Sequence, residues 1–245
     1  MIKQSIKSIL NSFFGLFNLK VNKITQSNDF FYYILKTLDY FNIDTVLDIG
    51  ANKGQFAEKL IKFGYSKKII SFEPMQMAFD ILKKKTEKYD NWIVNERVGF
   101  GNKVEERILN ISINSVSSSI LKLNKKHIIQ EPTAKFFKKE KIKLTTLNSL
   151  LNDKKFKKKK IFIKIDTQGY EKNIILGASR VLKKIKGVML EASILPLYRN
   201  ENNFTKMIQF MKKKGFYVWA IERGFSNKSS GRVLQLDIIF INKNV

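Results

Sequence analysis

The sequence of 245 residues contains no cysteine and only one histidine. The first absence excludes disulfide bonds and thiolate metal sites, and the second excludes a histidine-rich metal centre. Carboxylates alone could hold Mg²⁺, but nothing in the sequence supports this, so we assign no metal ligand. Runs of 18 or more apolar residues are also absent, so we expect no transmembrane helix. The N-terminus lacks the unbroken apolar core and cleavage site of a secretory signal, and we expect a cytoplasmic protein.

Arginine is scarce, with six residues against 40 lysines. The formal net charge of +25, from 46 basic and 21 acidic residues, raises nucleic acid or an anionic membrane as partners. Arginine, however, is the preferred residue for bidentate binding of phosphates and bases. We therefore interpret most lysines, including the lysine-rich run at 154–160, as a solvated surface. Contact of that run with phosphate or anionic lipid is the alternative.

Residues 1–42 carry two amphipathic segments. In the first, apolar residues recur at helical spacing on one face; they are Ile2, Ile6, Ile9, Leu10, Phe13, Phe14 and Phe17. This helix either rests on a membrane, peripheral to its inner face, or packs on the protein's own core. The second segment, 30–41, is expected to cover a sheet edge or a cofactor. Residues 43–245 then form one catalytic domain, because no linker separates a second hydrophobic core.

The most informative segment is 46–56, in which a buried strand enters a glycine-bounded turn and then a helix. Asp48 precedes the first glycine, and Glu73 ends the next apolar run. Glycines let backbone approach a ligand, and an acid at a strand's carboxyl end can accept both ribose hydroxyls. This pair of acids indicates S-adenosyl-L-methionine. NAD is disfavoured because the Gly-x-Gly-x-x-Gly fingerprint is absent. The cofactor-binding candidates are Asp48, Gly50, Ala51, Asn52, Gly54, Glu73, Pro74, Asn95 and Val98.

Strand and helix patterns alternate along most of the chain. They predict an α/β fold of the class I methyltransferase, Rossmann-like type, with a seven-stranded, mostly parallel sheet, helices on both faces and an antiparallel last strand. A region at about 100–140 interrupts the pattern: 104–112 alternates like a β ribbon, and a serine-rich and then polar stretch runs to Lys139. We interpret it as an insertion near the active site, either a substrate lid or a loose surface loop.

Several blocks occur in the order typical of one family. They are Leu47-Asp48-Ile49-Gly50-Ala51-Asn52-Lys53-Gly54, Ser71-Phe72-Glu73-Pro74, Ser117-Ser118-Ser119, Thr146-Leu147-Asn148-Ser149-Leu150-Leu151, Ile163-Lys164-Ile165-Asp166-Thr167-Gln168-Gly169-Tyr170-Glu171 and Leu236-Asp237-Ile238-Ile239-Phe240. Over about 43–242 the chain resembles the FkbM family of S-adenosylmethionine-dependent methyltransferases. It departs at Asn148, where the family often has an acid. The resemblance implies O-methylation, commonly of sugar hydroxyls in surface glycans or of secondary metabolites.

Three residues are candidates for acceptor positioning or general base catalysis. Asp166 ends the fourth parallel strand, although it could instead cap the following turn. Glu191 ends the next strand and either reaches the same cavity or pairs with Arg199. His127 suits a base because histidine titrates near neutral pH, but it could equally be an idle surface residue.

We therefore predict an S-adenosylmethionine-dependent O-methyltransferase acting on a sugar hydroxyl of a bacterial surface polysaccharide or lipid-linked glycan, with a peripheral contact to anionic membrane as a further expectation. An RNA or DNA methyltransferase is the enzyme alternative suggested by the charge, and it is disfavoured because the motif for exocyclic nitrogen and the cysteine for pyrimidine attack are absent. A docking module without catalysis in a glycan-assembly complex is the other alternative.

Overall fold

The computed structural model describes the chain except for residues 1, 18, 21, 23, 26–27, 125–127, 130 and 228, and the side chains of 2–6. Seven strands form the central sheet in the order β3-β2-β1-β7-β8-β10-β9. Their bounds are Thr45–Ile49 (β1), Lys68–Phe72 (β2), Trp92–Val94 (β3), Ile161–Ile165 (β7), Ile185–Ser193 (β8), Phe216–Arg223 (β9) and Gln235–Asn242 (β10). Only β10 runs antiparallel to its neighbours. The predicted fold class is confirmed.

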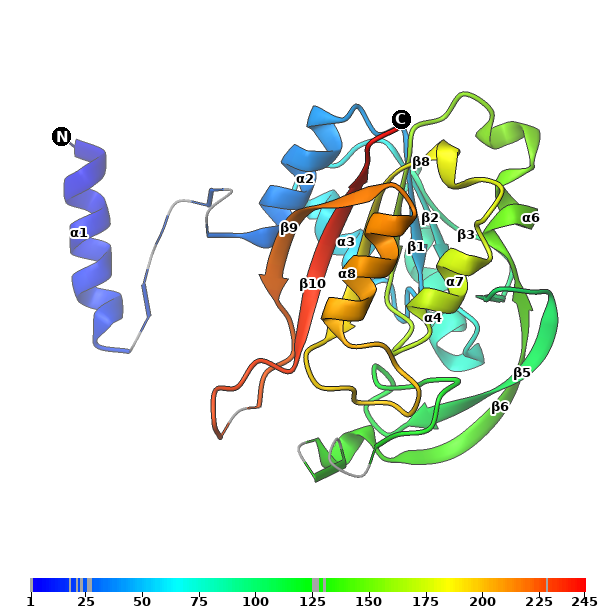
Figure 1. Cartoon of the computed structure of the whole chain (residues 1–245). Coiled ribbons are helices and arrows are strands. Elements are labelled where there is room, and N and C mark those ends of the chain that lie inside the picture. Colours follow the sequence, from blue (N-terminus) through cyan, green and yellow to red (C-terminus); the bar gives the residue numbers. More distant parts are fainter. Residues whose placement is uncertain are drawn as a thin grey trace.

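Helices cover both faces of this sheet (Figure 1). They are α2 (Phe30–Tyr40), α3 (Gln55–Lys62), α4 (Gln76–Thr86), α6 (Leu147–Leu151), α7 (Glu171–Leu176) and α8 (Phe204–Lys213). Successive strand residues point to opposite faces, so Val46 packs in one core cluster with α2 and α3, and Leu47 packs in another with α7 and α8. Because both faces are covered, the central strands are continuously apolar rather than alternating.

A second sheet replaces the loose insertion expected at 100–140. It contains β4 (Gly99–Phe100), β5 (Glu105–Ser112) and β6 (Phe136–Thr145), in the order β4-β6-β5, and curls around one side of the molecule (Figure 1). The expected ribbon at 104–112 is present as β5. Residues 136–139, expected to belong to a polar stretch, are instead the start of β6 and pair with β5. Phe136 is half-buried against Leu123, Leu197 and Tyr198, whereas residues 137–139 are all exposed, so the alternating hydrophobic signal of a strand is missing there.

One further expectation differs from the structure, and another is met except at one residue, since the lysines of the run at 154–160 are exposed, as expected, but the phenylalanine among them is not. The helix expected over about 171–182 ends at Leu176, because Gly177 packs against the backbone of Gly101; a Cβ on Gly177 would lie 2.0 Å from the Gly101 carbonyl oxygen. In the lysine-rich run, Phe156 is buried in the core within a 3-10 turn at Lys154–Phe156. Tertiary packing, which local sequence patterns do not report, decides both cases.

The two N-terminal helices behave differently. α2 buries Ile34 and Leu38 against the sheet, and Asp29 caps it by accepting from the backbone N–H groups of Phe31 and Tyr32. α1 (Ile2–Gly15) stands apart from the body (Figure 1). Its Phe13 side chain is 59% exposed, so the described part of α1 does not pack on the protein's own core. Among the described residues, no helix is long and apolar enough to cross a membrane.

Substitution of Gly54 tests whether close packing of the turn before α3 contributes to the stability of the protein. It has a φ of +79°, and a Cβ there would lie 2.6 Å from the Trp92 ring. We expect Gly54→Ala to lower the free energy of unfolding by about 2–5 kcal/mol, since backbone strain and overpacking add. Gly231, at φ +68° and with no atom within 4 Å of the position that a Cβ would take, is the matched control. Gly231→Ala should lose only about 1 kcal/mol in urea unfolding; equal losses would contradict the packing role of Gly54.

Candidate active site

The turn after β1 brings two strand ends together. Gly50 adopts a φ of +72°, and a Cβ there would lie 2.0 Å from the carbonyl oxygen of Asp166, at the end of β7. The backbone N–H groups of Gly50 and Ala51 both donate to the Phe72 carbonyl at the end of β2. Glycine at position 50 is therefore required by protein packing, which places the ends of β1, β2 and β7 side by side.

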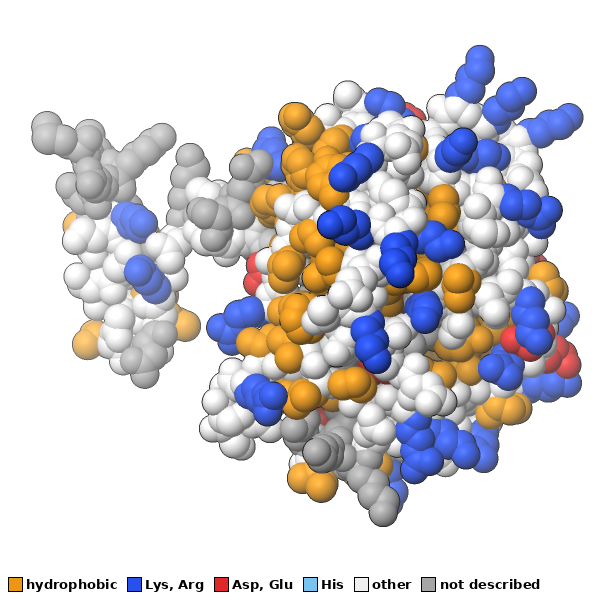
Figure 2. Space-filling model, in the orientation of Figure 1, with side chains coloured by type: hydrophobic (Ala, Val, Ile, Leu, Met, Phe, Trp, Pro, Cys, Tyr) orange, Lys and Arg blue, Asp and Glu red, His pale blue; other side chains and the backbone are white. Residues whose placement is uncertain are grey.

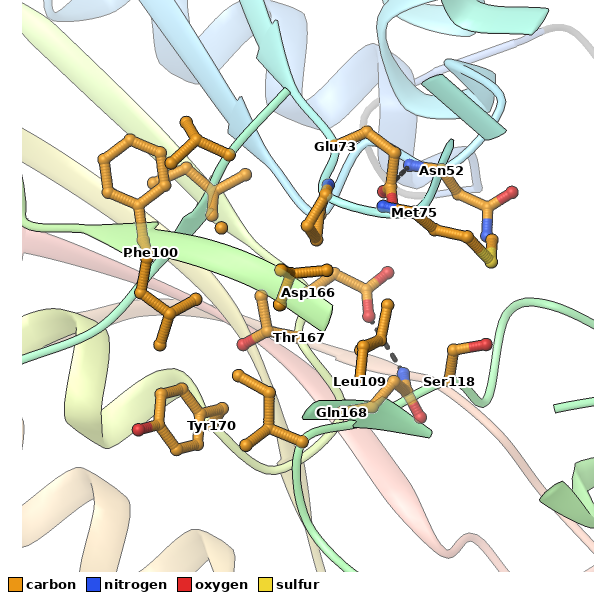
Figure 3. Close-up of a pocket in the computed structure, with 18 of the residues that line it drawn as sticks. Asn52, Glu73, Met75, Phe100, Leu109, Ser118, Asp166, Thr167, Gln168 and Tyr170 are labelled. Carbon is orange, nitrogen blue, oxygen red and sulfur yellow. Dashed lines mark hydrogen bonds between the residues drawn. The ribbon is translucent and has the colours of Figure 1, made fainter. Parts of the chain in front are cut away.

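A pocket of about 610 Å³, its open mouth included, lies over these strand ends (Figure 3). The aromatic side chains of Phe100 and Tyr170 lie at one end, and Asn52 and Ser118 lie at the other. Its remaining lining residues come from the strand ends, the second sheet and the serine-rich loop, and include Ile49, Gly50, Glu73, Pro74, Met75, Val98, Gly99, Leu109, Ser115, Val116, Asp166, Thr167 and Gln168. Apolar walls with a few convergent polar groups are typical of a small-molecule site.

Glu73 is the main polar group at the β2 side of this pocket. Its carboxylate accepts from the backbone N–H of Asn52 at 2.8 Å and from that of Met75 at 2.8 Å (Figure 3). Burial raises the pKa of Glu73 to about 7, although these two hydrogen bonds act in the opposite direction. Each carboxylate oxygen keeps a lone pair, so the ribose hydroxyls of a nucleoside fit here. The apolar residues Pro74 and Val98 in the same pocket fit its base.

Lys164 joins the ends of β1 and β7 beneath the turn. Its ammonium lies 3.1 Å from Asp48 Oδ1 and 3.6 Å from Asp166 Oδ2, and it donates to the Gly50 carbonyl. Burial acts to lower the pKa of Lys164, but the charges of Asp48 and Asp166 outweigh it and raise that pKa above the ordinary lysine value. Asp48 is fully buried and also accepts from Ser71. Asp48 thus supports the turn from below and does not line the pocket.

Asp166 is half-buried and borders the pocket. Its carboxylate accepts from the Gln168 side-chain amide at 2.9 Å (Figure 3). The alternative role, capping of the following turn, belongs to another residue. Glu171 accepts from the backbone N–H groups of Thr167 and Gly169 and from the Thr167 hydroxyl. Since Glu171 holds the turn, the Asp166 carboxylate stays available to a ligand.

Glu191 lies beyond Asp166, at the end of β8. It accepts from the side-chain amides of Gln168 at 2.8 Å and Gln235 at 2.7 Å, and neither bond involves Arg199. Burial, followed by the nearby charges of Asp166 and Asp237, raises the pKa of Glu191 well above that of an ordinary glutamate. A second pocket opens here, and it is lined by Asn114, Val116, Ser117, Glu131, Asp166, Gln168, Glu191, Phe225 and Gln235. Asp166 and Gln168 therefore border both pockets.

The remaining predicted site residues divide by position. Ala51 borders a neighbouring hollow together with Asn52, Lys164 and Asp166. Gly54 and Asn95 do not line the first pocket: Gly54 packs on Trp92, and the Asn95 backbone bonds to Ser71. His127 lies outside the described residues.

Sequence reasoning missed several residues that shape the site. The serine-rich loop is held in place and largely buried. Ser119 donates to the Gln168 carbonyl, and the single hydrogen of the Tyr198 hydroxyl lies between two acceptors, the Ser117 carbonyl and the Gln168 side-chain oxygen. Lys164 could have been recognised in the sequence as a lone cation inside an apolar strand. In the structure it lies directly opposite Asp48 in the β1–β7 register. Gln168 and Tyr198 left no comparable signal, because apart from the bond between Gln168 and Asp166 these contacts join segments that are distant in sequence.

Comparison with models of known protein families identifies the family of this chain. The model described as "Methyltransferase FkbM domain" matches residues 48–218. The chain belongs to the FkbM methyltransferase family. It is therefore an S-adenosylmethionine-dependent methyltransferase, and S-adenosylmethionine is its cofactor. The matched span includes Glu73, Asp166 and Glu191, so the strand ends that border both pockets lie within the FkbM domain.

Solved structures resemble this FkbM methyltransferase only distantly. The methyltransferase domain of bacterial CtHen1-C has 10% identity and a TM-score of 0.49, with 89% of this chain and 99% of that chain covered. M. capricolum TrmK in complex with S-adenosyl-homocysteine has 8% identity and a TM-score of 0.46, with 86% and 68% covered. The human methyltransferase 10 domain containing protein has 11% identity and a TM-score of 0.45, with 97% of both chains covered. No curated protein matches the sequence.

The raised pKa of Glu73 predicts pH-dependent cofactor binding. A protonated carboxyl has lost acceptor capacity for the ribose hydroxyls, so affinity should fall as pH falls through 7. If only the ionised form binds, S-adenosylhomocysteine should bind roughly 30-fold more weakly at pH 5.5 than at pH 8 in calorimetry. Glu73→Gln should bind weakly at both values. Glu106→Gln, at an exposed glutamate of β5, should keep the wild-type profile; the same profile in Glu73→Gln would refute the assignment.

Lys164 predicts a second measurable effect, on stability. Lys164→Met leaves the fully buried Asp48 carboxylate without its cation and should lower the free energy of unfolding by about 3–5 kcal/mol. Adding Asp48→Asn removes the unpaired charge, so the double variant should regain at least about 1 kcal/mol in a double-mutant cycle. Strictly additive losses would mean that the pair does not stabilise the turn.

Proposed function

We propose that this FkbM methyltransferase transfers a methyl group to a hydroxyl of a sugar, in a bacterial surface polysaccharide or a lipid-linked glycan. The observation that supports this most is the position of Asp166, which borders both the pocket that fits a nucleoside and the second pocket beside it. A hydroxyl held in the second pocket lies next to a carboxylate that can accept its proton. The two pockets then serve cofactor and acceptor.

The proposed mechanism assigns one task to each residue. S-adenosylmethionine, when bound, supplies an electrophilic methyl group on sulfur. Glu73 holds the ribose, and the buried serine-rich loop helps to keep water from the strand ends. The Asp166 carboxylate would accept the proton of the acceptor hydroxyl as that oxygen gains the methyl group, and the electron pair of the former methyl–sulfur bond would remain on the sulfur of S-adenosylhomocysteine. Positioning supplies about 7–11 kcal/mol of the barrier, and a base adds about 10²–10⁴-fold.

The lining of the second pocket favours a neutral, hydroxyl-rich acceptor. Asn114, Gln168 and Gln235 give part of this lining an uncharged, polar character, which suits sugar hydroxyls better than a charged group would. Phe225 adds an aromatic surface for an apolar face of a ring. The carboxyl groups of Asp166 and Glu191 would repel a phosphate placed beside them. Only the basic outer surface, and not this pocket, suits an anionic portion of the acceptor.

The nucleic-acid alternative has support from the charge alone. Lysine and arginine side chains are spread over the visible surface (Figure 2), and such a surface attracts nucleic acid in a salt-dependent manner. The acidic lining around Asp166 disfavours a phosphodiester chain at the reacting position. The non-catalytic docking alternative requires loss of cofactor binding, whereas the Glu73 carboxylate and the pocket beside it are intact.

Asp166→Asn tests the proposed base. The amide keeps the shape of the side chain but cannot take a proton, so we expect the turnover number to fall about 10²–10⁴-fold. The affinity for S-adenosylhomocysteine should change little. Methyl transfer from labelled cofactor to fractionated bacterial glycans and to total RNA is the measurement, with Asp153→Asn, at an exposed remote site, as the control. Unchanged turnover would rule out Asp166 as the base, and labelling of RNA instead of glycan would overturn the proposed acceptor.

A further inference from the structure

α1 exposes an apolar face that no described part of the protein covers. Ile9 is 68% exposed, Phe13 59% and Phe17, just beyond the helix, 64%. Leu16 and Leu19 continue the exposed apolar surface. The Phe13 ring lies 6.0 Å from that of Phe17, so the aromatic residues form one cluster rather than scattered contacts. We call this surface, formed by Ile9, Phe13, Leu16, Phe17 and Leu19, the N-terminal apolar face.

The charges around this face have one sign. The first 28 residues of the chain contain four lysines and no aspartate or glutamate. Lys7 and Lys20, both exposed, flank the apolar face, and the other described polar positions of α1 are uncharged serine and asparagine. Exposed aromatic and aliphatic side chains bordered by lysine are the pattern of a helix that lies in the headgroup region of an anionic bilayer.

The length of α1 fixes its orientation there. Its 14 residues extend over about 21 Å, which is shorter than the hydrocarbon core of about 30 Å. Its apolar residues also occupy one face rather than the whole circumference. Both features exclude a spanning arrangement for α1 and fit a helix that lies parallel to the surface.

Net charge disfavours a second copy of the chain as the partner of this face. Pairing two copies through α1 would bring together two lysine-bearing segments that lack acids, each attached to a body of the same sign within a chain of net charge +25. An anionic bilayer would instead attract these positively charged segments. Figure 2 shows lysine side chains on the N-terminal segment and lysine and arginine side chains across the visible face of the body, so the attraction is not limited to the helix.

The chain after α1 leads directly to the catalytic centre. α2 follows at Phe30, and Phe30 and Phe31 border a hollow that also contains Asn52, Lys164 and Asp166. The connection at 16–29 has 14 residues and can reach at most about 50 Å. A bilayer bound by α1 therefore lies within reach of the mouth of the site.

We propose that the N-terminal apolar face is a membrane-surface anchor that binds anionic phospholipid bilayers. In this arrangement Phe13 and Phe17 insert at the boundary of headgroups and acyl chains, and Lys7 and Lys20 contact the anionic headgroups. The proposed anchor does not depend on which acceptor is methylated, so it can be tested independently of the proposed sugar methylation.

Vesicle flotation of the full-length protein tests the anchor. The probes are phosphatidylcholine vesicles with and without about 30% phosphatidylglycerol. The protein should float with the anionic vesicles, and Phe13→Ser/Phe17→Ser should reduce its partition coefficient at least roughly tenfold, because two large apolar side chains are removed from the contact. Val104→Ser/Ile129→Ser, which removes two exposed apolar residues of the body, is the matched control and should float like the wild type. Binding of S-adenosylhomocysteine checks that each variant is folded.

Three results would overturn the proposal. The wild type could fail to float with anionic vesicles. The Phe13/Phe17 variant could float as well as the wild type, which would assign binding to the lysines of the body. Sedimentation without lipid could show a dimer that the same variant abolishes, which would assign the face to a second copy. Loss of flotation in Lys7→Glu/Lys20→Glu, with binding of the wild type weakened by salt, would support the proposed headgroup contact.

Discussion

The contact between the ends of β1 and β7 determines the rest of the site. Gly50 has no side chain, and the Asp166 backbone occupies the space that a Cβ would fill. Lys164 lies directly below and neutralises Asp48 while bonding to the Gly50 carbonyl. Removing the glycine would push the strands apart, and removing the lysine would leave a buried carboxylate unpaired. Asp166 borders two pockets because this backbone contact fixes its place at the end of β7, and not because of any bond that its side chain makes.

Buried carboxylates around this contact have different roles because their partners differ. Glu171 is satisfied by backbone N–H groups of the turn it holds, and burial raises its pKa to about 7. Glu73 makes a similar pair of backbone bonds but faces a pocket, so it retains acceptor capacity for a ligand. Asp166 is half-buried, and the Gln168 side-chain amide bonds to only one of its carboxylate oxygens. Identical functional groups thus divide into a structural support, a candidate cofactor ligand and a candidate base.

Sequence patterns predicted the features that depend on local chemistry. The apolar strands, the turn at Gly50 and the acid at the end of β2 each leave a signature within a few residues. The start of β6 left none, because the side chains at 137–139 are all exposed and do not alternate between apolar and polar. Gly177, which follows α7, packs on Gly101, far away in sequence. The turn is capped by Glu171 rather than Asp166, because the chain conformation brings the Glu171 carboxylate to the backbone N–H groups of Thr167 and Gly169. Long-range packing thus accounts for the differences.

The outer surface is basic, whereas the lining of the second pocket is acidic. The surface charge therefore indicates what attracts the protein, and the pocket lining indicates what it methylates. A net charge of +25 draws the molecule toward any polyanion, and taken alone it suggests nucleic acid as substrate. The charged side chains that line the second pocket, however, are the acids Glu131, Asp166 and Glu191, which oppose a phosphate placed in that pocket. Charge over the whole surface governs encounter, whereas the few groups within hydrogen-bond distance govern chemistry. The basic surface is therefore better assigned to the surroundings in which the acceptor is found than to the acceptor group itself.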